Sequence, residues 1–395
     1  MALGIYISVP FCRTKCSYCN FASDVFSHAL FERYVDRVCA DIENSRKTAA
    51  EMGGELEHEV DSIYLGGGTP TVLASAQLER IFTTVRRQFD VSAQAEVTVE
   101  CAPGTLTSAM VETLLRCGVN RVSLGVQSFV DQEAAVVGRL HNRATVLEEI
   151  TRLRSAGISN INIDLIAGLP HQTAESWDFS LSEAIATGAP HASVYMLEVD
   201  EDSRLGSELL AGGARYHAHF VPDEEATADF YLAACSRFQS SGTKQYEISN
   251  FAREGFESLH NLKYWTRQPY LGFGVDAHSM LISTTPEIDA VRFAGADSLD
   301  KYVSGGPPQL TVVSHRAAFE ESFFLGLRLN RGVSLREIAA KSGEAAVDSA
   351  RPIVAELVES GLMEQEEDVV WLTSRGRLLS NEVFQRFILA EEVAR

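Results

Sequence analysis

The sequence lacks several features that would mark whole classes of protein. Its 395 residues hold 34 Lys and Arg against 54 Asp and Glu, and the net charge of −20 argues against nucleic acid as a partner. No run approaches the roughly 18 apolar residues that span a bilayer, and the N-terminus lacks the pattern of a signal peptide. With 45% hydrophobic and 22% charged residues, we expect a folded cytoplasmic protein without membrane insertion.

The cysteines do not follow the pattern of a disulfide framework. They are seven, an odd number, and three of them crowd one short stretch while the other four stand apart: Cys12, Cys16 and Cys19 against Cys39, Cys101, Cys117 and Cys235. Crowded thiols in a chain without an export signal indicate metal binding or redox chemistry in a reducing compartment.

Short apolar runs alternate with stretches of helical spacing through the first half of the chain. Six strands are predicted, at residues 5–9, 62–65, 96–99, 121–124, 160–166 and 192–197. Strand followed by helix, six times over, predicts an α/β fold with a parallel sheet, a partial (β/α)6 barrel over residues 1–200.

The second half divides into two further predicted parts. Residues 201–309 are less regular, and we interpret them as an extension packed on the barrel. Residues 310–395 show three helices, a short hairpin and a final helix, which is the outline of a winged-helix-like α/β domain. Winged helices often bind DNA, but this segment has 10 basic and 14 acidic residues, which favours a docking or structural role.

Polar and glycine-rich residues follow the predicted strands. Barrels of this kind keep their chemistry in the loops at the carboxyl ends of the strands. The cysteines follow the first strand and a glycine-rich turn, residues 66–70, follows the second, where its amides could face an anion. Later strand ends carry Glu100, Gln127, Asp164 and Glu198. Each alone has a simpler explanation, such as a tight turn or a salt bridge, but their joint placement favours a site.

The three crowded cysteines have the spacing Cys-x3-Cys-x2-Cys. Thiolates select zinc or iron–sulfur centres. A structural zinc ion would need a fourth ligand nearby, and His28 is the only candidate in the next turns. Three cysteines without a clear fourth ligand favour a [4Fe-4S] cluster with one open iron, with a zinc knuckle as the alternative.

The stretch Tyr-Ile-Ser-Val-Pro-Phe-Cys-x3-Cys-Ser-Tyr-Cys, residues 6–19, resembles the signature of radical S-adenosylmethionine (SAM) proteins. Nearly the whole chain resembles the family of oxygen-independent coproporphyrinogen oxidases and their haem-chaperone relatives. The resemblance implies that Cys12, Cys16 and Cys19 hold the cluster and that SAM binds its open iron. It further implies SAM contacts from Tyr6, Tyr18, Gly67, Gly68, Thr69, Glu100, Gln127, Arg139 and Asp164.

Several features of the sequence indicate which branch of this family the chain resembles. The oxidases carry a further cysteine two positions after the third ligand, here Phe21, and a longer arm before the motif, where this sequence has eleven residues before Cys12. His260-Asn-Leu-Lys-Tyr264-Trp265 is similar to the H-N-x-x-Y-W signature of the chaperone branch. His260 could supply an axial imidazole to haem, and Tyr264 and Trp265 could supply flat faces. His278 is a rival ligand, and a turn histidine beside core aromatics is the simpler explanation.

The resemblance therefore implies a haem chaperone with a [4Fe-4S] cluster and SAM. It would bind haem and pass it to haem-requiring proteins, membrane respiratory enzymes among them, and a reductant protein would serve the cluster. The alternative is an oxygen-independent oxidase that decarboxylates coproporphyrinogen III to protoporphyrinogen IX by radical chemistry, so whether the chain is an enzyme stays open. A third function, RNA modification by radical chemistry, is disfavoured by the acidic charge.

Overall fold

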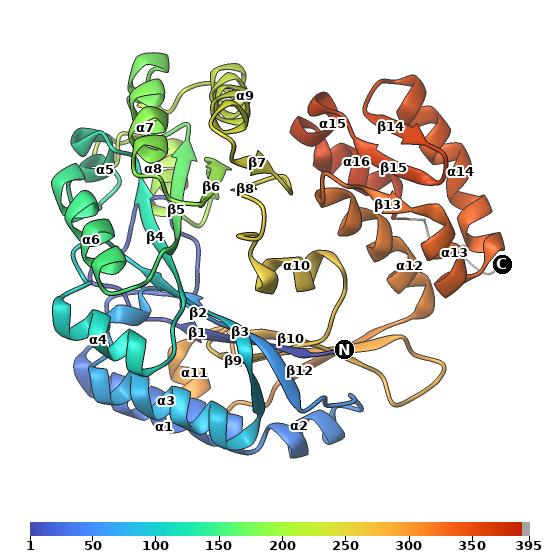
Figure 1. Cartoon of the computed structure of the whole chain (residues 1–395), viewed down its shortest axis with the longest axis horizontal. Coiled ribbons are helices and arrows are strands. Elements are labelled where there is room, and N and C mark those ends of the chain that lie inside the picture. Colours follow the sequence, from blue (N-terminus) through green and yellow to red (C-terminus); the bar gives the residue numbers. More distant parts are fainter. Residues whose placement is uncertain (389–395) are drawn as a thin grey trace.

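The computed structural model describes residues 1–388 and shows a mixed α/β fold built on six parallel strands (Figure 1). These strands lie side by side in chain order, each followed by a helix, so the predicted partial (β/α)6 barrel is confirmed. They are β1 (Leu3–Val9), β2 (Glu59–Gly67), β3 (Asp90–Cys101), β4 (Arg121–Gln127), β5 (Asn160–Ala167) and β6 (His191–Met196).

Helices pack against the sheet and form its main hydrophobic core. In α1, Phe31, Tyr34, Val38 and Ile42 recur at helical spacing and are all buried, as expected for an amphipathic helix with one face on a sheet. The helices of this layer are α1 (His28–Glu43), α2 (Ser45–Glu51), the 3-10 helix η1 (Pro70–Val72), α3 (Ser75–Gln88), α4 (Ser108–Arg116), α5 (Asp131–Val136), α6 (Arg143–Ser155) and α7 (Ala174–Ala186).

Residues 201–309 are more regular than the sequence indicated, because their strands extend the same sheet to twelve within residues 1–388. Beside β6 lie β8 (Asn250–Ala252) and β7 (Lys244–Gln245), and beside β1 lie β9 (Tyr270–Gly274), β10 (His278–Ile282), β11 (Ala290–Ala294) and β12 (Gln309–Val313). With two to five residues each, these strands are too short to show a period in the sequence. The helices here are α8 (Arg204–Ala211), η2 (Ala218–Phe220), α9 (Glu224–Ser240), α10 (Leu259–Trp265) and α11 (Leu299–Val303).

The C-terminal lobe has a second hydrophobic core and stands beside the barrel in Figure 1. Its helices surround a three-stranded antiparallel sheet of order β13-β15-β14, so the winged-helix-like fold is confirmed with one strand, β13, that the sequence did not predict. The elements are α12 (His315–Phe324), η3 (Gly326–Arg328), β13 (Val333–Ser334), α13 (Leu335–Ser342), α14 (Glu344–Glu359), β14 (Met363–Glu366), β15 (Val369–Leu372), α15 (Ser374–Leu378) and α16 (Ser380–Arg386). Residues 389–395 of the predicted segment lie outside the described part.

The lobe is tied to the rest of the chain through the segment before β8. The Ile248 amide donates to the Arg328 carbonyl at 3.1 Å, and the Asn330 amide donates to the Tyr246 carbonyl at 3.0 Å. The Ile248 side chain also belongs to the core of the lobe. In Figure 1, α10 lies between the sheet and this lobe, so the two parts meet around it.

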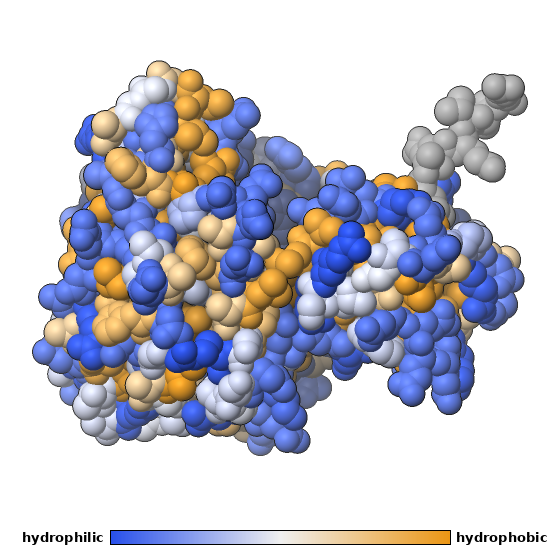
Figure 2. Space-filling view, turned by 90° about the horizontal axis from the view of Figure 1, so that it is seen from above, coloured by the Kyte–Doolittle hydropathy of each residue, from blue (hydrophilic) through white to orange (hydrophobic). Residues whose placement is uncertain are grey.

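Three further features of residues 1–388 concern the helices, the surface and the cysteines. None of these helices combines the length and the apolar character needed to cross a membrane. On the face shown in Figure 2, hydrophobic residues gather in separate groups among hydrophilic ones. All seven cysteines are unpaired, which leaves the three clustered thiols available as ligands.

Candidate functional site

One large cavity opens at the carboxyl ends of the barrel strands. Its volume is about 730 Å³, which is within the usual range of small-molecule sites. The barrel brings together around this cavity candidate residues that are far apart in sequence: Cys12, Cys16, Tyr18, Cys19, Gly67, Gly68, Thr69, Glu100, Gln127, Arg139 and Asp164. The residues that line it do not include Tyr6, His260, Tyr264 and Trp265.

The cysteine loop connects β1 to α1 and places its sulfur atoms next to hydrogen-bond donors. The Cys12 amide donates to the Asp24 carbonyl at 3.0 Å and so closes the loop. Thr69 Oγ1 donates to Cys12 Sγ at 3.9 Å, and Arg139 Nη1 donates to Cys16 Sγ at 3.6 Å. Donors and positive charge beside sulfur suit the thiolate ligands of a bound metal, while burial raises the pKa of the Cys12 thiol in the protein alone.

The side chains around the three thiols bear on the choice between an iron–sulfur cluster and a single zinc ion. Within residues 1–388, no three His, Cys, Asp or Glu side chains converge closely enough to hold one metal ion. A zinc ion needs its sulfur ligands about 2.3 Å from one point, whereas an iron–sulfur cluster spreads its thiolate ligands over several irons. His28, the fourth ligand that zinc would need, packs on Phe31 and is not among the residues that line the cavity. The residues present therefore fit a [4Fe-4S] cluster.

The glycine-rich turn after β2 packs tightly against the cysteine loop. The Gly68 amide donates to the Val9 carbonyl at 2.8 Å and the Thr69 amide donates to the Phe11 carbonyl at 2.7 Å. A side chain at Gly68 would lie 2.6 Å from the Phe11 carbonyl oxygen, so the position requires glycine. The amides of Gly68 and Thr69 are therefore used within the protein, whereas the Gly67 amide donates to the carboxyl group of Glu100 at 3.1 Å.

Two half-buried carboxyl groups line the cavity from β3 and β5. Glu100 accepts hydrogen bonds from the Tyr64 hydroxyl at 2.8 Å and from the Gly67 amide at 3.1 Å. Asp164 accepts one from the Ser123 hydroxyl at 2.9 Å. Burial, followed by the charge of Asp164, raises the pKa of Glu100 to about 7, and burial raises the pKa of Asp164. A cationic ligand in the cavity would favour the charged form of both groups.

Gln127 and Arg139 reach the cavity from the end of β4 and from the loop after α5. Gln127 has a left-handed φ of 68° where the pairing between β4 and β5 shifts its register, which turns the strand end towards the cavity. Arg139 also donates to the Gly125 carbonyl and is thereby fixed. Nearby His141 Nε2 lies 3.1 Å from the Val126 carbonyl oxygen, and burial, followed by the charge of Arg139, lowers its pKa to about 4.

The H-N-x-x-Y-W segment forms α10, and its histidine is buried. His260 is 1% exposed, with Nδ1 at 3.1 Å from the Ser62 hydroxyl and Nε2 at 2.8 Å from the Tyr264 hydroxyl. Its amide donates to Glu96 at 3.3 Å, and burial, followed by the charge of Lys263, lowers its pKa to about 3. A haem iron can reach neither ring nitrogen unless one of these hydrogen bonds opens.

Two other candidates, Tyr6 and His278, also lie outside the cavity lining. The Tyr6 ring lies behind the wall, with its centroid 6.1 Å from that of Tyr64 and 6.2 Å from that of His260. Burial, followed by the charge of Glu100, raises the pKa of Tyr6. His278 lies on β10, where its side chain is 63% exposed and Nε2 lies 3.8 Å from Asp276.

Sequence reasoning missed several polar residues that line the cavity. They are Tyr64, Arg121, Ser123, Asn162, Ser193 and Tyr195 from the barrel, and Asn250, Asn261, Arg328 and Arg377 from the later parts of the chain. The barrel set alternates with apolar residues along its strands, and this period of two is a signal that could have found it. No local signal marks Arg328 or Arg377, because the fold alone brings the C-terminal lobe to the cavity.

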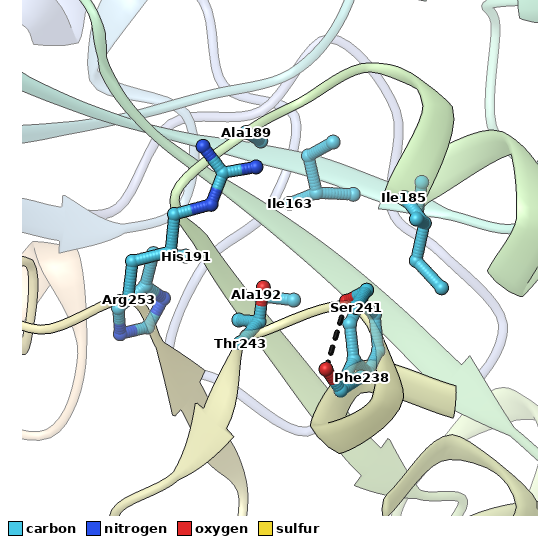
Figure 3. A pocket seen from close by; sticks show the side chains of 10 residues that line it. Ile163, Ile185, Ala189, His191, Ala192, Phe238, Ser241, Thr243 and Arg253 are labelled. Carbon is cyan, nitrogen blue, oxygen red and sulfur yellow. Dashed lines mark hydrogen bonds between the residues drawn. The ribbon is translucent and has the colours of Figure 1, made fainter. Parts of the chain in front are cut away.

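A second cavity, of about 30 Å³, lies between α7, α9 and the sheet (Figure 3). Figure 3 shows Ile163, Ile185 and Phe238 around it, and the Ser241 hydroxyl donates to the Phe238 carbonyl at 2.8 Å. His191 lies beside this cavity. The volume suffices for about two water molecules, so this cavity is a packing gap and the chemistry belongs to the larger one.

Comparison with known proteins assigns this arrangement to a class. The family model of the Radical SAM superfamily matches residues 6–183, and that of the HemN C-terminal domain matches residues 313–379. The solved structure of coproporphyrinogen III oxidase (HemN) from Escherichia coli, a radical SAM enzyme, has the same fold, with a TM-score of 0.81 and 22% identity over 98% of this chain and 90% of that one. The fold and the three-cysteine site define a radical SAM protein.

Curated relatives narrow the class to one family. The heme chaperone HemW of Bacillus subtilis is 35% identical over 97% of this chain and 98% of its own length. HemW of Lactococcus lactis is 31% identical over 97% of both chains, and HemW of Escherichia coli is 30% identical over 98% of both. Because the identity extends over nearly the whole of each protein, the chain belongs to the HemW family.

Proposed function

We propose that this protein is a haem chaperone, which binds haem and transfers it to haem-requiring acceptor proteins. The observation that carries the proposal is the 35% identity to HemW over nearly the full length of both chains. The barrel is common to the chaperone and to the oxidase, so the fold does not separate them. Phe21, at the position of the additional oxidase cysteine, and the H-N-x-x-Y-W motif support the chaperone.

We also propose that Cys12, Cys16 and Cys19 hold the [4Fe-4S] cluster and that SAM occupies the adjoining part of the cavity. When bound, the two groups supply one-electron chemistry, and the protein binds and orients them. The carboxyl groups Glu100 and Asp164 suit the ribose hydroxyls of SAM, and the guanidinium of Arg139 suits its carboxylate. The remaining proposed contacts are Tyr6, acting from behind Tyr64, and Tyr18, Gly67, Gly68, Thr69 and Gln127.

The axial haem ligand stays a prediction, and the structure adds a condition to it. His260 can act as the ligand only after its hydrogen bond to Ser62 or to Tyr264 opens. His278 is exposed and needs no such opening. Replacing the true ligand by Ala changes the position and shape of the Soret band of bound haem. Replacing the other histidine leaves the band unchanged, so His260→Ala and His278→Ala, measured side by side, identify it.

We propose further that the acceptors include membrane respiratory enzymes, that a low-potential reductant protein serves the cluster, and that the protein works in the cytoplasm. The three neighbouring unpaired thiols support a reducing compartment.

We propose three functional parts, a barrel over residues 1–200, an extension over 201–309 and a lobe from residue 310. The separate core of the lobe and the family match over residues 313–379 support the second boundary.

A paired experiment tests the chaperone against the oxidase. The full-length protein, with its cluster reconstituted under anaerobic conditions, is titrated with haem and mixed with an apo-acceptor. In parallel it is assayed with coproporphyrinogen III, SAM and reductant. We expect stoichiometric haem binding, transfer of haem to the acceptor, and no protoporphyrinogen IX above background. Catalytic turnover to protoporphyrinogen IX would overturn the chaperone proposal.

A further inference from the structure

The C-terminal lobe places two arginines on the wall of the large cavity. The residues of the lobe that line it are Arg328, Arg377, Leu378, Ser380 and Asn381. Arg328 ends η3 and Arg377 lies on α15, so two separate elements bring positive charge to one wall. The protein as a whole has a net charge of −20, and this wall therefore differs in sign from the rest of the molecule.

Arg328 has hydrogen-bonding capacity that the described part of the protein leaves unused. Its side chain is 26% exposed, and its Nε is buried without a hydrogen-bond partner. The carboxylate of Glu247 lies 3.8 Å from Nη2, which is an ion pair too long for a hydrogen bond. A buried N–H donor such as this Nε lowers the stability of the protein unless an acceptor is present, so the arrangement requires an explanation.

Trp265 of the H-N-x-x-Y-W motif lies against this guanidinium. The carbon at the centre of the Arg328 guanidinium is 4.2 Å from the centroid of the Trp265 ring, a cation–π contact. Trp265 Nε1 is also buried without a partner. Two neighbouring N–H donors without acceptors indicate that an acceptor, either water or an anionic ligand, belongs beside them.

Both arginines are held in place before any ligand binds. The Arg328 carbonyl accepts the Ile248 amide at 3.1 Å, which ties its backbone to the extension. Arg377 donates to the Leu372 carbonyl at 2.9 Å and to the Ser374 hydroxyl at 3.1 Å, and other donors of its guanidinium remain for a ligand. Because these donors are fixed in advance, the protein loses less side-chain entropy when a ligand binds, as expected for a built site.

We propose that Arg328 and Arg377 bind the carboxylate groups of the tetrapyrrole cargo and that Trp265 positions Arg328 for this contact. Haem carries two propionates, and a planar guanidinium binds a carboxylate through two parallel hydrogen bonds. This inference rests on the proposed function and deepens it, because it identifies the part of haem that the lobe recognises. It also gives the tryptophan of the motif a role that needs no contact with the macrocycle.

The test compares haem with haem dimethyl ester, in which both propionates are uncharged. The full-length protein with reconstituted cluster is titrated with each ligand from the same detergent stock, and binding is followed by absorbance. We expect Arg328→Gln to weaken haem binding about tenfold or more, and Arg377→Gln to act in the same direction. Arg331→Gln, an exposed arginine of the same lobe, is the matched control and leaves the affinity unchanged. The ester binds the wild type and Arg328→Gln equally well.

Arg328→Lys, together with the Arg377→Gln variant, separates recognition from folding. Arg328→Lys keeps the charge but loses the planar fork, so we expect it to recover only part of the affinity. Arg377 has no ion pair with Glu247, so Arg377→Gln tests the same wall without disturbing that pair. Unchanged haem affinity in both Gln variants, or equal weakening for haem and its ester, would overturn this inference and leave the chaperone proposal standing. A wild-type protein that binds neither ligand would overturn both.

Discussion

His260 Nε2 lies 2.8 Å from the hydroxyl oxygen of Tyr264, one helical turn further along α10. Side chains at i and i+4 of a helix face the same side, so the spacing of the motif follows from helix geometry. With the Ser62 hydroxyl on Nδ1, the imidazole links β2 to α10. Trp265, at the end of the same helix, continues this link to Arg328 of the C-terminal lobe. The motif therefore connects the barrel to the C-terminal lobe through contacts within the protein, without any ligand.

His260→Ala should lower the stability of the protein. The substitution leaves the hydroxyls of Ser62 and Tyr264 without their buried partner and removes a packed ring, which together cost about 1–3 kcal/mol. His278→Ala, at an exposed position, is the matched control and should change stability by less than about 0.5 kcal/mol. Urea unfolding of the full-length variants measures both, and equal midpoints would show that the buried hydrogen bonds do not support the fold.

The same histidine should make stability depend on pH. Burial, followed by the charge of Lys263, lowers the pKa of His260 to about 3 from its ordinary value of 6.5. Below pH 6.5 His260 binds a proton in the unfolded chain but stays neutral in the folded protein, so the free energy of unfolding falls as pH falls. From pH 7.5 to pH 5.5 this loss is about 1.4 kcal/mol for one histidine.

His260→Gln removes this titration and keeps a hydrogen-bonding side chain. Unfolding free energies at pH 7.5 and pH 5.5 should therefore differ less in the variant than in the wild type. Other buried histidines, such as His141, titrate in the same direction in both proteins, and their contribution cancels in the comparison. Parallel pH profiles for the two proteins would contradict the assignment.

The sequence predicted the barrel well because its strands alternate with helices, several of which, such as α1, α3 and α6, are long enough to show a period. The strands after residue 200 were missed, since β7 and β8 have two and three residues and β9 pairs with β1 across more than 260 residues of chain. The position of such a short strand depends on the strand with which it pairs in space. A pattern within a few residues does not indicate that partner.

For the candidate site, the sequence predicted the residues at the strand ends but not the contacts that depend on the packing of distant parts of the chain. The cavity unites the strand-end residues Cys12, Glu100 and Asp164, because parallel strands end on one side of a barrel. The contact between Trp265 and Arg328 was not predictable, because it depends on how the lobe docks. The burial of His260 likewise follows from the packing of α10 on β2, and its sequence neighbours alone do not reveal it.

Replacing any one of Cys12, Cys16 and Cys19 by Ala should abolish the cluster. Each thiolate is a proposed iron ligand, and the described residues show no other group of three ligands that could replace them. Iron and sulfide content after anaerobic reconstitution, together with the visible absorption of the cluster, measures the effect. Cys235→Ala, at a partly exposed thiol outside the cavity lining, is the control and should keep full iron content. A variant of the three that retained four irons would contradict its assignment as a ligand.

Binding of SAM should strengthen as pH rises through neutrality. Burial, followed by the charge of Asp164, raises the pKa of Glu100 to about 7, so near neutral pH about half of the molecules carry a protonated Glu100. SAM is positively charged at its sulfonium, and a cation favours the deprotonated carboxylate. A ligand that binds only this form gains up to about tenfold in affinity between pH 6 and pH 8. Equilibrium dialysis of labelled SAM against the reconstituted protein measures the change.

In Glu100→Gln we expect weaker binding with a flat pH profile. Glu198 lines the same cavity, and Glu198→Gln should keep the wild-type profile. A wild-type profile that is flat, or one that Glu100→Gln leaves unchanged, would remove Glu100 from the SAM site.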